Sequence, residues 1–248
     1  MASDMDRRRV LITGLGTVNP LGHNTADSWQ AVRDGVCGIG PITQYDSSAQ
    51  KVHLAAEVKG WDPEQVLDKR EAKRMARCSQ LAMASAREAL ADSGLDLEQV
   101  DRTRCGVIVS SGIGGLTVTE QELIKALEKG FDRVSPFYIP MTISNMAAGL
   151  IAIDARFLGM CTCPVTACAG GTNAVGDAFR HIRDGYAEVM LCGGTESVIE
   201  RLAIGGFTNM KALSTSQDPD RASIPFDAER SGFVMGEGAG MLLLEEYE

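Results

Sequence analysis

Residues 165–179 read VTACAGGTNAVGDAF, and this stretch sets a single thiol, Cys168, at the junction of two expected elements. The run 160–165 is short and apolar, as is typical of a strand, and the chain after it continues to Gly185 without proline. Apolar side chains recur there at helical spacing, at Val175, Phe179 and Ile182. We therefore expect a strand, a sharp turn and a helix, with Cys168 in the first turn of that helix.

A cysteine in the first turn of a helix is well placed for chemistry. The unpaired backbone N–H groups and the positive end of the helix dipole favour its thiolate, which is the nucleophilic form. The small neighbours Ala167, Ala169 and Gly170 leave room for a substrate carbonyl to reach the backbone N–H of Cys168 as an oxyanion donor. Most free cysteines are instead small buried hydrophobes, and this stretch alone does not decide between the two.

Composition and charge exclude several classes of protein. The chain has 248 residues, of which 44% are hydrophobic and 23% charged, as in an ordinary soluble globular protein. It has no apolar run of the ~20 residues that a membrane span needs, and residues 1–9 lack the apolar core of a signal peptide, so we expect a cytoplasmic protein. The net charge of -9 argues against nucleic acid as a partner. Its seven cysteines form no repeated CxxC pairs, which favours reduced thiols over disulfides or structural zinc.

One basic cluster stands out against this acidic background. It consists of Lys69, Arg70, Lys73, Arg74 and Arg77. Such a run is most often a solvated helix face. The alternative is a docking patch that steers an acidic partner by electrostatics.

The segment 9–18 sets an apolar run ahead of Gly14-Leu15-Gly16, which resembles the start of a dinucleotide-binding loop. The third glycine of that motif is missing, because Asn19 occupies its place, and no strand that ends in an acidic residue follows at the right distance. We therefore predict a core strand followed by a tight turn, without a bound dinucleotide.

The rest of the chain alternates between helical and strand patterns, which predicts an α/β sheet. The expected helices are 25–34, 71–93, 117–129 and 144–158, and the further expected strands are 105–110, 188–192 and 239–245. In the first helix we expect Trp29 and Val32 to face inward. Thr117 and Glu120 resemble a capping box. Pro136 and Pro140 predict an extended loop, and 195–235 reads as a long excursion that carries pocket residues.

The chain resembles the condensing enzymes of fatty-acid synthesis, the β-ketoacyl-[acyl carrier protein] synthase II family. The resemblance lies in 11–16 (LITGLG), 111–115 (SGIGG), 135–137 (SPF), 166–168 (TAC), 193–196 (GGTE), 205–207 (GGF), 211–214 (KALS) and 225–240 (PFDAERSGFVMGEGAG). It implies the thiolase-like fold, an αβαβα arrangement built from two similar halves. Since the family is considerably longer, we expect residues 1–248 to form its N-terminal domain, a mixed five-stranded sheet with helices on both faces, without the C-terminal half.

The resemblance also implies a reaction. Cys168 would take an acyl group from acyl carrier protein, and decarboxylative Claisen condensation with malonyl-loaded carrier would give a 3-oxoacyl product two carbons longer, without a metal or organic cofactor. In the family the condensation uses two histidines, a nearby lysine and a second oxyanion donor from a later region. His23, His53 and His181 match none of these, and His181 lies thirteen residues along the helix, about 20 Å from Cys168. We therefore expect acyl transfer without elongation from this chain alone.

Further site residues follow from the resemblance alone. Ile113 and Phe207 match residues that line and gate the acyl pocket. Tyr138 and Ile139 match a loop that reaches into the pocket of a neighbouring subunit, which implies a homodimer. The residues that match the family's docking site for acyl carrier protein are Arg70, Lys73 and Arg74.

Two other functions remain open. One is a polyketide-type ketosynthase or its chain-length partner, although such partners usually lack the active cysteine. The other is a non-catalytic module that binds acyl carrier protein, which the basic cluster alone can support.

Overall fold

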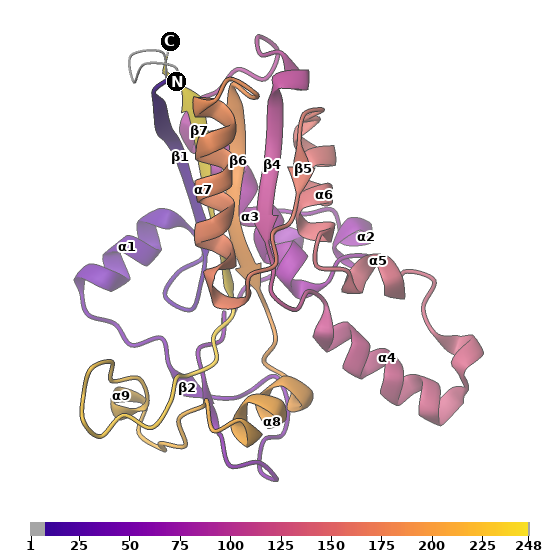
Figure 1. The fold of residues 1–248 in the computed structure, drawn as a ribbon. Helices are drawn as coiled ribbons and strands as arrows, with labels where there is room; N and C mark the ends of the chain where they lie inside the picture. The colour runs from indigo at the N-terminus through magenta and orange to yellow at the C-terminus, as the bar shows by residue number, and fades with distance from the viewer. Residues whose placement is uncertain (1–7, 248) are drawn as a thin grey trace.

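A five-stranded sheet lies at the centre of the computed structural model, which describes residues 8–247. Its strands lie in the order β1-β7-β6-β4-β5 (Figure 1). Strands β4, β5 and β6 are parallel to one another, whereas β7 is antiparallel to both of its neighbours. Their bounds are β1 Val10–Val18, β4 Cys105–Ser110, β5 Cys161–Thr162, β6 Val189–Glu196 and β7 Gly238–Glu246. The expected mixed sheet of five strands is thus confirmed.

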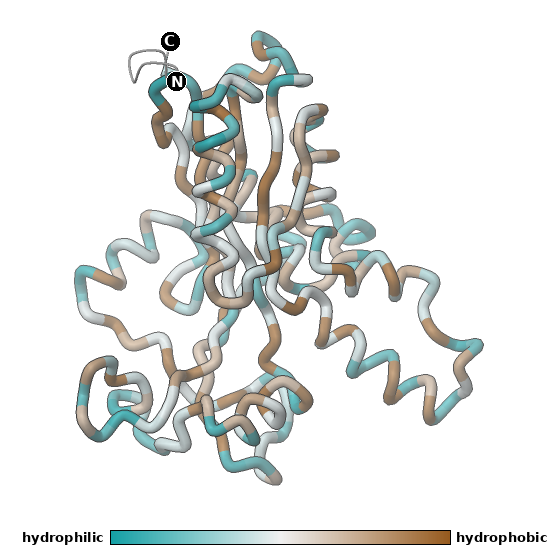
Figure 2. Tube along the Cα trace, viewed as in Figure 1, coloured by the Kyte–Doolittle hydropathy of each residue, from teal (hydrophilic) through white to brown (hydrophobic). Residues whose placement is uncertain are grey.

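Helices cover both faces of this sheet, as predicted. Helices α3 (Arg77–Ser93) and α6 (Met146–Ala155) pack on one face, and α7 (Gly170–Arg183) packs on the other, where it lies over β4 and β6 (Figure 1). All six residues of β4 are buried, and the tube in Figure 2 is brown over the middle of this strand. A strand covered on both faces must be apolar throughout, which explains the continuous run that predicted it.

Helix α7 packs on the sheet through small residues. Its buried side chains are Ala174, Ala178 and Ile182, which contact Ile108 of β4 and other residues of the same apolar cluster. Phe179, which the helical spacing placed in this stripe, is instead exposed. Phe179 follows Ala178 directly, which places it about 100° around the helix from the buried row.

The tight turn predicted after the first strand is present at 19–22, where Asn19 and Gly22 exchange backbone hydrogen bonds, but Gly14 and Gly16 lie within β1 and not in the turn. The strand runs unbroken in sequence from Val10 to Val18, with a register shift between Ile12 and Gly14. Helix α3 lies so close that a Cβ on Gly14 would be 2.0 Å from the carbonyl oxygen of Ala89, and one on Gly16 would be 1.9 Å from that of Ser85. The Gly-x-Gly pattern therefore serves helix-to-strand packing.

Two predicted helices differ from expectation in how they pack. In α1 (Thr25–Arg33) only Ser28 is buried, and Trp29 and Val32 are 62% and 54% exposed, so the prediction that they face inward was wrong. The predicted helix 71–93 is split into α2 (Lys69–Ala72) and α3. Asp68 caps the short α2, because its carboxylate accepts from the N–H of Arg70 at 2.8 Å.

The excursion around α4 (Leu116–Lys129) and α5 (Tyr138–Thr142) also differs. No side chain caps α4, and Glu120 accepts instead from the backbone N–H of Leu202, so the capping-box prediction was wrong. The segment predicted as an extended loop contains α5. Pro140 is compatible with it because it stands in the first turn, where backbone N–H groups have no partner within the helix.

The remaining elements are short and lie mostly at the lower end of the sheet in Figure 1. Helix α8 (Arg201–Asn209) and α9 (Pro219–Ala222) belong to the excursion 195–235. Strand β3 (Leu54–Ala55) pairs with β2 (Gly40–Pro41). The 3-10 turns are η2 Pro63–Gln65, η3 Arg102–Arg104, η4 Phe131–Arg133 and η5 Ala167–Ala169. Over residues 8–247, none of the helices has both the length and the apolar character needed to cross a membrane.

The contact between β1 and α3 gives a test of the fold. Replacing Gly16 by alanine should lower the free energy of unfolding by about 1–3 kcal/mol, because the new methyl group overlaps the backbone of Ser85. Gly240→Ala is the matched control, since a Cβ there has no heavy atom within 4 Å. Urea unfolding of both variants would measure the difference, and an equal shift of the two midpoints would contradict the packing argument.

Candidate active site

Cys168 lies in the turn that joins β5 to α7. The turn is η5, which directly precedes α7, so the thiol stands one short turn before the helix and not inside its first turn. Cys168 is exposed. Ala167, immediately before it, has φ of 50°, a left-handed conformation that costs a non-glycine residue roughly 1–3 kcal/mol. The expected strand, sharp turn and helix are therefore present, and backbone strain is stored next to the thiol.

Glycine allows this turn to lie directly on the ends of the strands. A Cβ on Gly170 would be 1.9 Å from Oγ of Ser110, the last residue of β4. That hydroxyl donates to the carbonyl of Pro164 at 2.6 Å, which ties the chain before the turn to the same strand. On the neighbouring strand, a Cβ on Gly194 would be 3.1 Å from Cα of Gly171. The start of α7 thus contacts the ends of both β4 and β6.

The backbone N–H of Cys168 is available as a donor. Among the described residues it has no hydrogen-bond acceptor, whereas the N–H of Ala169 donates to the carbonyl of Thr166 at 3.2 Å. A carbonyl oxygen that approaches the thiol can therefore be bound by this N–H group.

A cavity of about 590 Å³ opens beside the thiol. Its apolar lining includes Ile113, Phe207, Phe233 and Met235, and the rings of Phe207 and Phe233 meet edge to face with their centres 5.8 Å apart. The structure thus brings three residues to one cavity: Cys168 from η5, Ile113 from the loop after β4, and Phe207 from α8. An apolar cavity with a single thiol can hold a hydrocarbon chain attached to that sulfur.

Glu196 is a cavity residue that sequence reasoning missed. It is the last residue of β6, and its Oε2 accepts from the N–H of Gly112 at 2.9 Å and of Ile113 at 3.1 Å, while Oε1 accepts from Ser111 Oγ at 3.1 Å. Burial raises the pKa of Glu196, and these hydrogen bonds oppose the shift. The family motif 193–196 (GGTE) marked this residue in the sequence. The motif did not indicate that the carboxylate of Glu196 binds the loop after β4.

The other predicted site residues lie elsewhere. Tyr138 and Ile139 are on α5, and neither lines the cavity beside Cys168. The hydroxyl of Tyr138 donates to Thr119 Oγ1 at 3.4 Å, and the side chain of Ile139 is exposed. No histidine is found among the described residues that line this cavity.

The basic cluster divides into two parts. Arg70, Lys73 and Arg74 are exposed around α2, and the guanidinium of Arg74 lies 4.7 Å from the ring centre of Phe137. Arg77 is half-buried, and its guanidinium donates to Glu237 at 2.8 and 2.9 Å, so it does not belong to the exposed patch.

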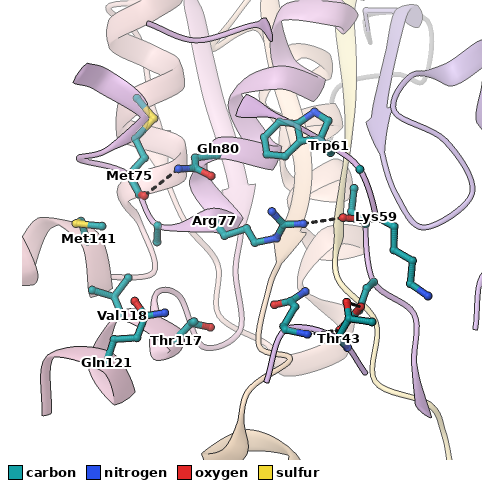
Figure 3. A pocket seen from close by; sticks show the side chains of 15 residues that line it. Thr43, Lys59, Trp61, Met75, Arg77, Gln80, Thr117, Val118, Gln121 and Met141 are labelled. Carbon is teal, nitrogen blue, oxygen red and sulfur yellow. Dashed lines mark hydrogen bonds between the residues drawn. The ribbon is translucent and has the colours of Figure 1, made fainter. Parts of the chain in front are cut away.

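A second cavity of about 680 Å³ lies around Arg77 (Figure 3). Figure 3 shows Arg77 reaching across it from the start of α3, with Thr117, Val118 and Gln121 of α4 on another wall. It lacks Cys168, and its buried charge is already neutralised by Glu237. We therefore place the chemistry in the smaller, apolar cavity.

Glu200 supports the wall that carries Phe207. Its carboxylate caps α8 by accepting from the N–H of Ala203 at 2.9 Å, while its other oxygen, Oε2, is buried without a partner among the described residues. Burial, followed by the nearby charge of Glu120, raises the pKa of Glu200 to about 7, although the backbone bond opposes this.

Fold and site together define a class of protein. Residues 7–248 match the family model of the β-ketoacyl synthase N-terminal domain. A match over nearly the whole chain shows that it belongs to the β-ketoacyl synthase family, with the thiolase-like fold of these enzymes.

Individual relatives carry a more particular name. The chain is 47% identical over 247 residues to a 3-oxoacyl-[acyl-carrier-protein] synthase 2 of Synechocystis sp., which covers 99% of this chain and 59% of that protein. It is 45% identical over 241 residues to the protein of the same name from Staphylococcus aureus strain COL. That alignment covers 97% of this chain and 58% of the relative. The chain thus spans less than two thirds of the length of these relatives.

Solved structures agree with this family. A β-ketoacyl synthase from Burkholderia phymatum has a TM-score of 0.86 at 30% identity and covers 97% of this chain and 59% of that one. The ishigamide ketosynthase/chain length factor has a TM-score of 0.88, also at 30% identity and with the same shares covered.

The raised pKa of Glu200 gives a test by pH. Because the folded chain favours protonated Glu200, its contribution to stability is complete below its ordinary value of 4.5 and is lost as the pH rises through about 7. Glu200→Gln keeps an oxygen acceptor and cannot ionise. Between pH 5 and pH 8 the urea midpoint of the wild type should therefore fall relative to that of Glu200→Gln.

Glu98→Gln is the control for this measurement, since the side chain of Glu98 is largely exposed. Its urea midpoint at the same pH values measures what the loss of an exposed carboxylate does by itself. A difference from the wild type that does not change with pH for Glu200→Gln would show that Glu200 is ionised in the folded chain throughout this range.

Proposed function

We propose that this chain carries the acyl-accepting site of a fatty-acid condensing enzyme, in which Cys168 takes an acyl group from acyl carrier protein. The observation that carries the proposal is the exposed thiol of Cys168 at the apolar cavity lined by Ile113 and Phe207. The relatives named 3-oxoacyl-[acyl-carrier-protein] synthase 2 support the same activity.

The transfer uses groups of the turn before α7. The thiolate of Cys168 attacks the carbonyl carbon of the thioester, and its free N–H group donates to the oxygen that becomes negative. The carbon–sulfur bond to the carrier then breaks, and the carrier thiolate leaves and takes up a proton. The acyl chain, now on Cys168, occupies the cavity between Ile113 and the two phenylalanines.

Condensation is the second part of the proposed activity. A malonyl group on a second carrier loses carbon dioxide, and the enolate attacks the acyl-cysteine to give 3-oxoacyl carrier protein. The cavity beside Cys168 offers no histidine among its described residues to assist that step. We therefore assign acyl transfer to this chain, and elongation to this chain together with the remaining part of a whole synthase.

The exposed patch Arg70, Lys73 and Arg74 is proposed as the docking site for acyl carrier protein. Its positive charge stands out on a chain of net charge -9, which suits an acidic partner. A solved relative at 29% identity is a type II polyketide acyl carrier protein in complex with its ketosynthase, which supports a carrier as the partner.

A homodimer is also proposed, with α5 at the interface. Exposed apolar side chains follow one another along this part of the chain, at Ile139 and Ile143, and again at Ile153 of α6. Apolar surface of this kind is typical of protein contacts. Tyr138 and Ile139 would then line the cavity of the partner subunit.

A polyketide-type ketosynthase is the second candidate. The observation in its favour is the fold similarity to the ishigamide ketosynthase/chain length factor. Cys168 separates this chain from a chain-length partner without the active cysteine, and also from a module that only binds the carrier. Loading with saturated acyl carriers in preference to polyketide intermediates would favour fatty-acid synthesis.

Acyl transfer can be tested by mass spectrometry. After incubation with decanoyl carrier protein, the peptide that contains Cys168 should gain one decanoyl group, and Cys168→Ser should gain none. Cys78, Cys105 and Cys192 are internal controls, because burial raises the pKa of their thiols to about 11, 11 and 12. Equal loading of the serine variant would contradict the proposal.

The same samples test elongation. With malonyl carrier protein added, the purified chain should release no 3-oxoacyl product while its acyl-cysteine persists. Elongation by this polypeptide alone would show that the residues needed for condensation are already present in it.

Docking can be tested by charge reversal. Replacing Arg70 and Arg74 by glutamate should weaken binding of acyl carrier protein about tenfold or more, and the loss should shrink as salt is added. The control is the double variant Lys129→Glu and Lys211→Glu, which lies away from the patch and has the same net charge as the variant of Arg70 and Arg74. Fluorescence anisotropy of labelled acyl carrier protein would measure the affinity of each variant. If the control weakens binding equally, net charge and not the patch determines affinity.

A further inference from the structure

The loop that follows β4 has no strand partner for its backbone. Strand β4 pairs with β6 as far as Ser110 and Gly194, and β6 continues two residues further to Glu196. Residues 111–115 therefore turn away from the sheet, and Ile113 on this loop lines the cavity beside Cys168.

One carboxylate replaces the missing partner. Oε2 of Glu196 accepts from two successive backbone N–H groups, those of Gly112 and Ile113. Its Oε1 accepts from Ser111 Oγ, which in turn accepts from the N–H of Gly114 at 3.0 Å. The donors of Ser111, Gly112 and Ile113 thus converge on Glu196, and the N–H of Gly114 is linked to it through Ser111. A Cβ on Gly112 would lie 3.0 Å from Oε2, so the loop is held close to the carboxylate.

We propose that Glu196 is a positioning residue that fixes the 111–114 loop, and through it the side chain of Ile113, so that the loop sets the length of acyl chain the cavity accepts. This inference rests on the proposed function for the identity of the ligand. The loop contact itself rests only on the hydrogen bonds of Glu196.

The hydrogen bonds favour positioning over proton transfer. Each oxygen of Glu196 already accepts from a loop donor, and three of the roughly four acceptor positions of the carboxylate are used in this way. Glutamine can keep the two backbone contacts, because its carbonyl oxygen accepts from both N–H groups. Its NH₂ group reverses the contact with Ser111, because it donates to Oγ in place of accepting from the hydroxyl. Alanine can make none of these contacts. The pair of variants therefore separates positioning from charge.

Hydrogen exchange tests the contact in the chain as it stands. In the wild type, the amides of Gly112 and Ile113 should exchange slowly for a loop. E196A should accelerate both by at least about tenfold, and E196Q should stay near the wild type. Wild-type amides that exchange at the rate of an open loop would overturn the proposal without any variant, so a variant that fails to fold does not leave it undecided.

Acyl loading of Cys168 tests the consequence. Each protein is offered equal mixtures of hexanoyl, decanoyl, tetradecanoyl and octadecanoyl carrier proteins, and the acyl groups on Cys168 are quantified. The wild type and E196Q should share one length profile, and E196A should accept a wider range of lengths. Total loading of E196A should change much less than its profile, because the thiol is untouched.

Glu122→Ala is the matched control. Glu122 also accepts a backbone N–H, that of Ser135 at 2.8 Å, but it lies outside the cavity, and its loss should leave the length profile unchanged. An E196A profile equal to that of the wild type would refute the positioning role, as would a changed profile in E196Q equal to that of E196A. If no protein loads acyl groups while the Gly112 and Ile113 amides are protected, the proposed function fails and the loop contact stands.

Discussion

The close approach of the start of α7 to the ends of β4 and β6 is the contact on which the site depends. It exists because glycine stands on both sides, at Gly170 and Gly171 of the helix and at Gly194 of the strand. A side chain at Gly170 would displace Ser110, which also holds the chain before the turn. The turn just before this contact contains the left-handed Ala167, and the next residue, Cys168, lines the cavity.

Buried carboxylates stabilise the irregular backbone around this contact. Glu196 receives two N–H groups of the loop after β4, and Glu57 receives those of Thr43 and Gln44 at 2.8 and 3.1 Å. Glu237, whose side chain is fully buried, receives the N–H of Val58 and the guanidinium of Arg77. A buried N–H without an acceptor is costly. Beyond the ends of the sheet these carboxylates accept the backbone hydrogen bonds that a neighbouring strand would otherwise accept. Part of the acidic balance is thus structural and does not reflect surface charge.

How well the sequence predicted the site depended on how local each residue's role is. Cys168 could be proposed from the sequence because its turn, its small neighbours, the following helix and the 166–168 motif lie within one short stretch. Glu196 was missed because its partners are 83 to 85 residues away along the chain. The failed capping box has the same cause, since Glu120 pairs with the N–H of Leu202, 82 residues distant. No local pattern distinguishes a carboxylate that caps its own helix from one that reaches another element.

By itself, the sequence determined the α/β alternation, the buried strand β4, the helix after Cys168 and the family, because each depends on neighbouring residues or on a motif read in order. The tertiary structure alone decided which glycines make turns and which allow close packing, as at Gly14 and Gly16 under α3. It also decided that Trp29 is exposed and that Ile113, Phe207 and Cys168 share one cavity. The physical reason is that burial and hydrogen-bond pairing are settled between elements far apart in the chain, by space that only the assembled sheet and helices define.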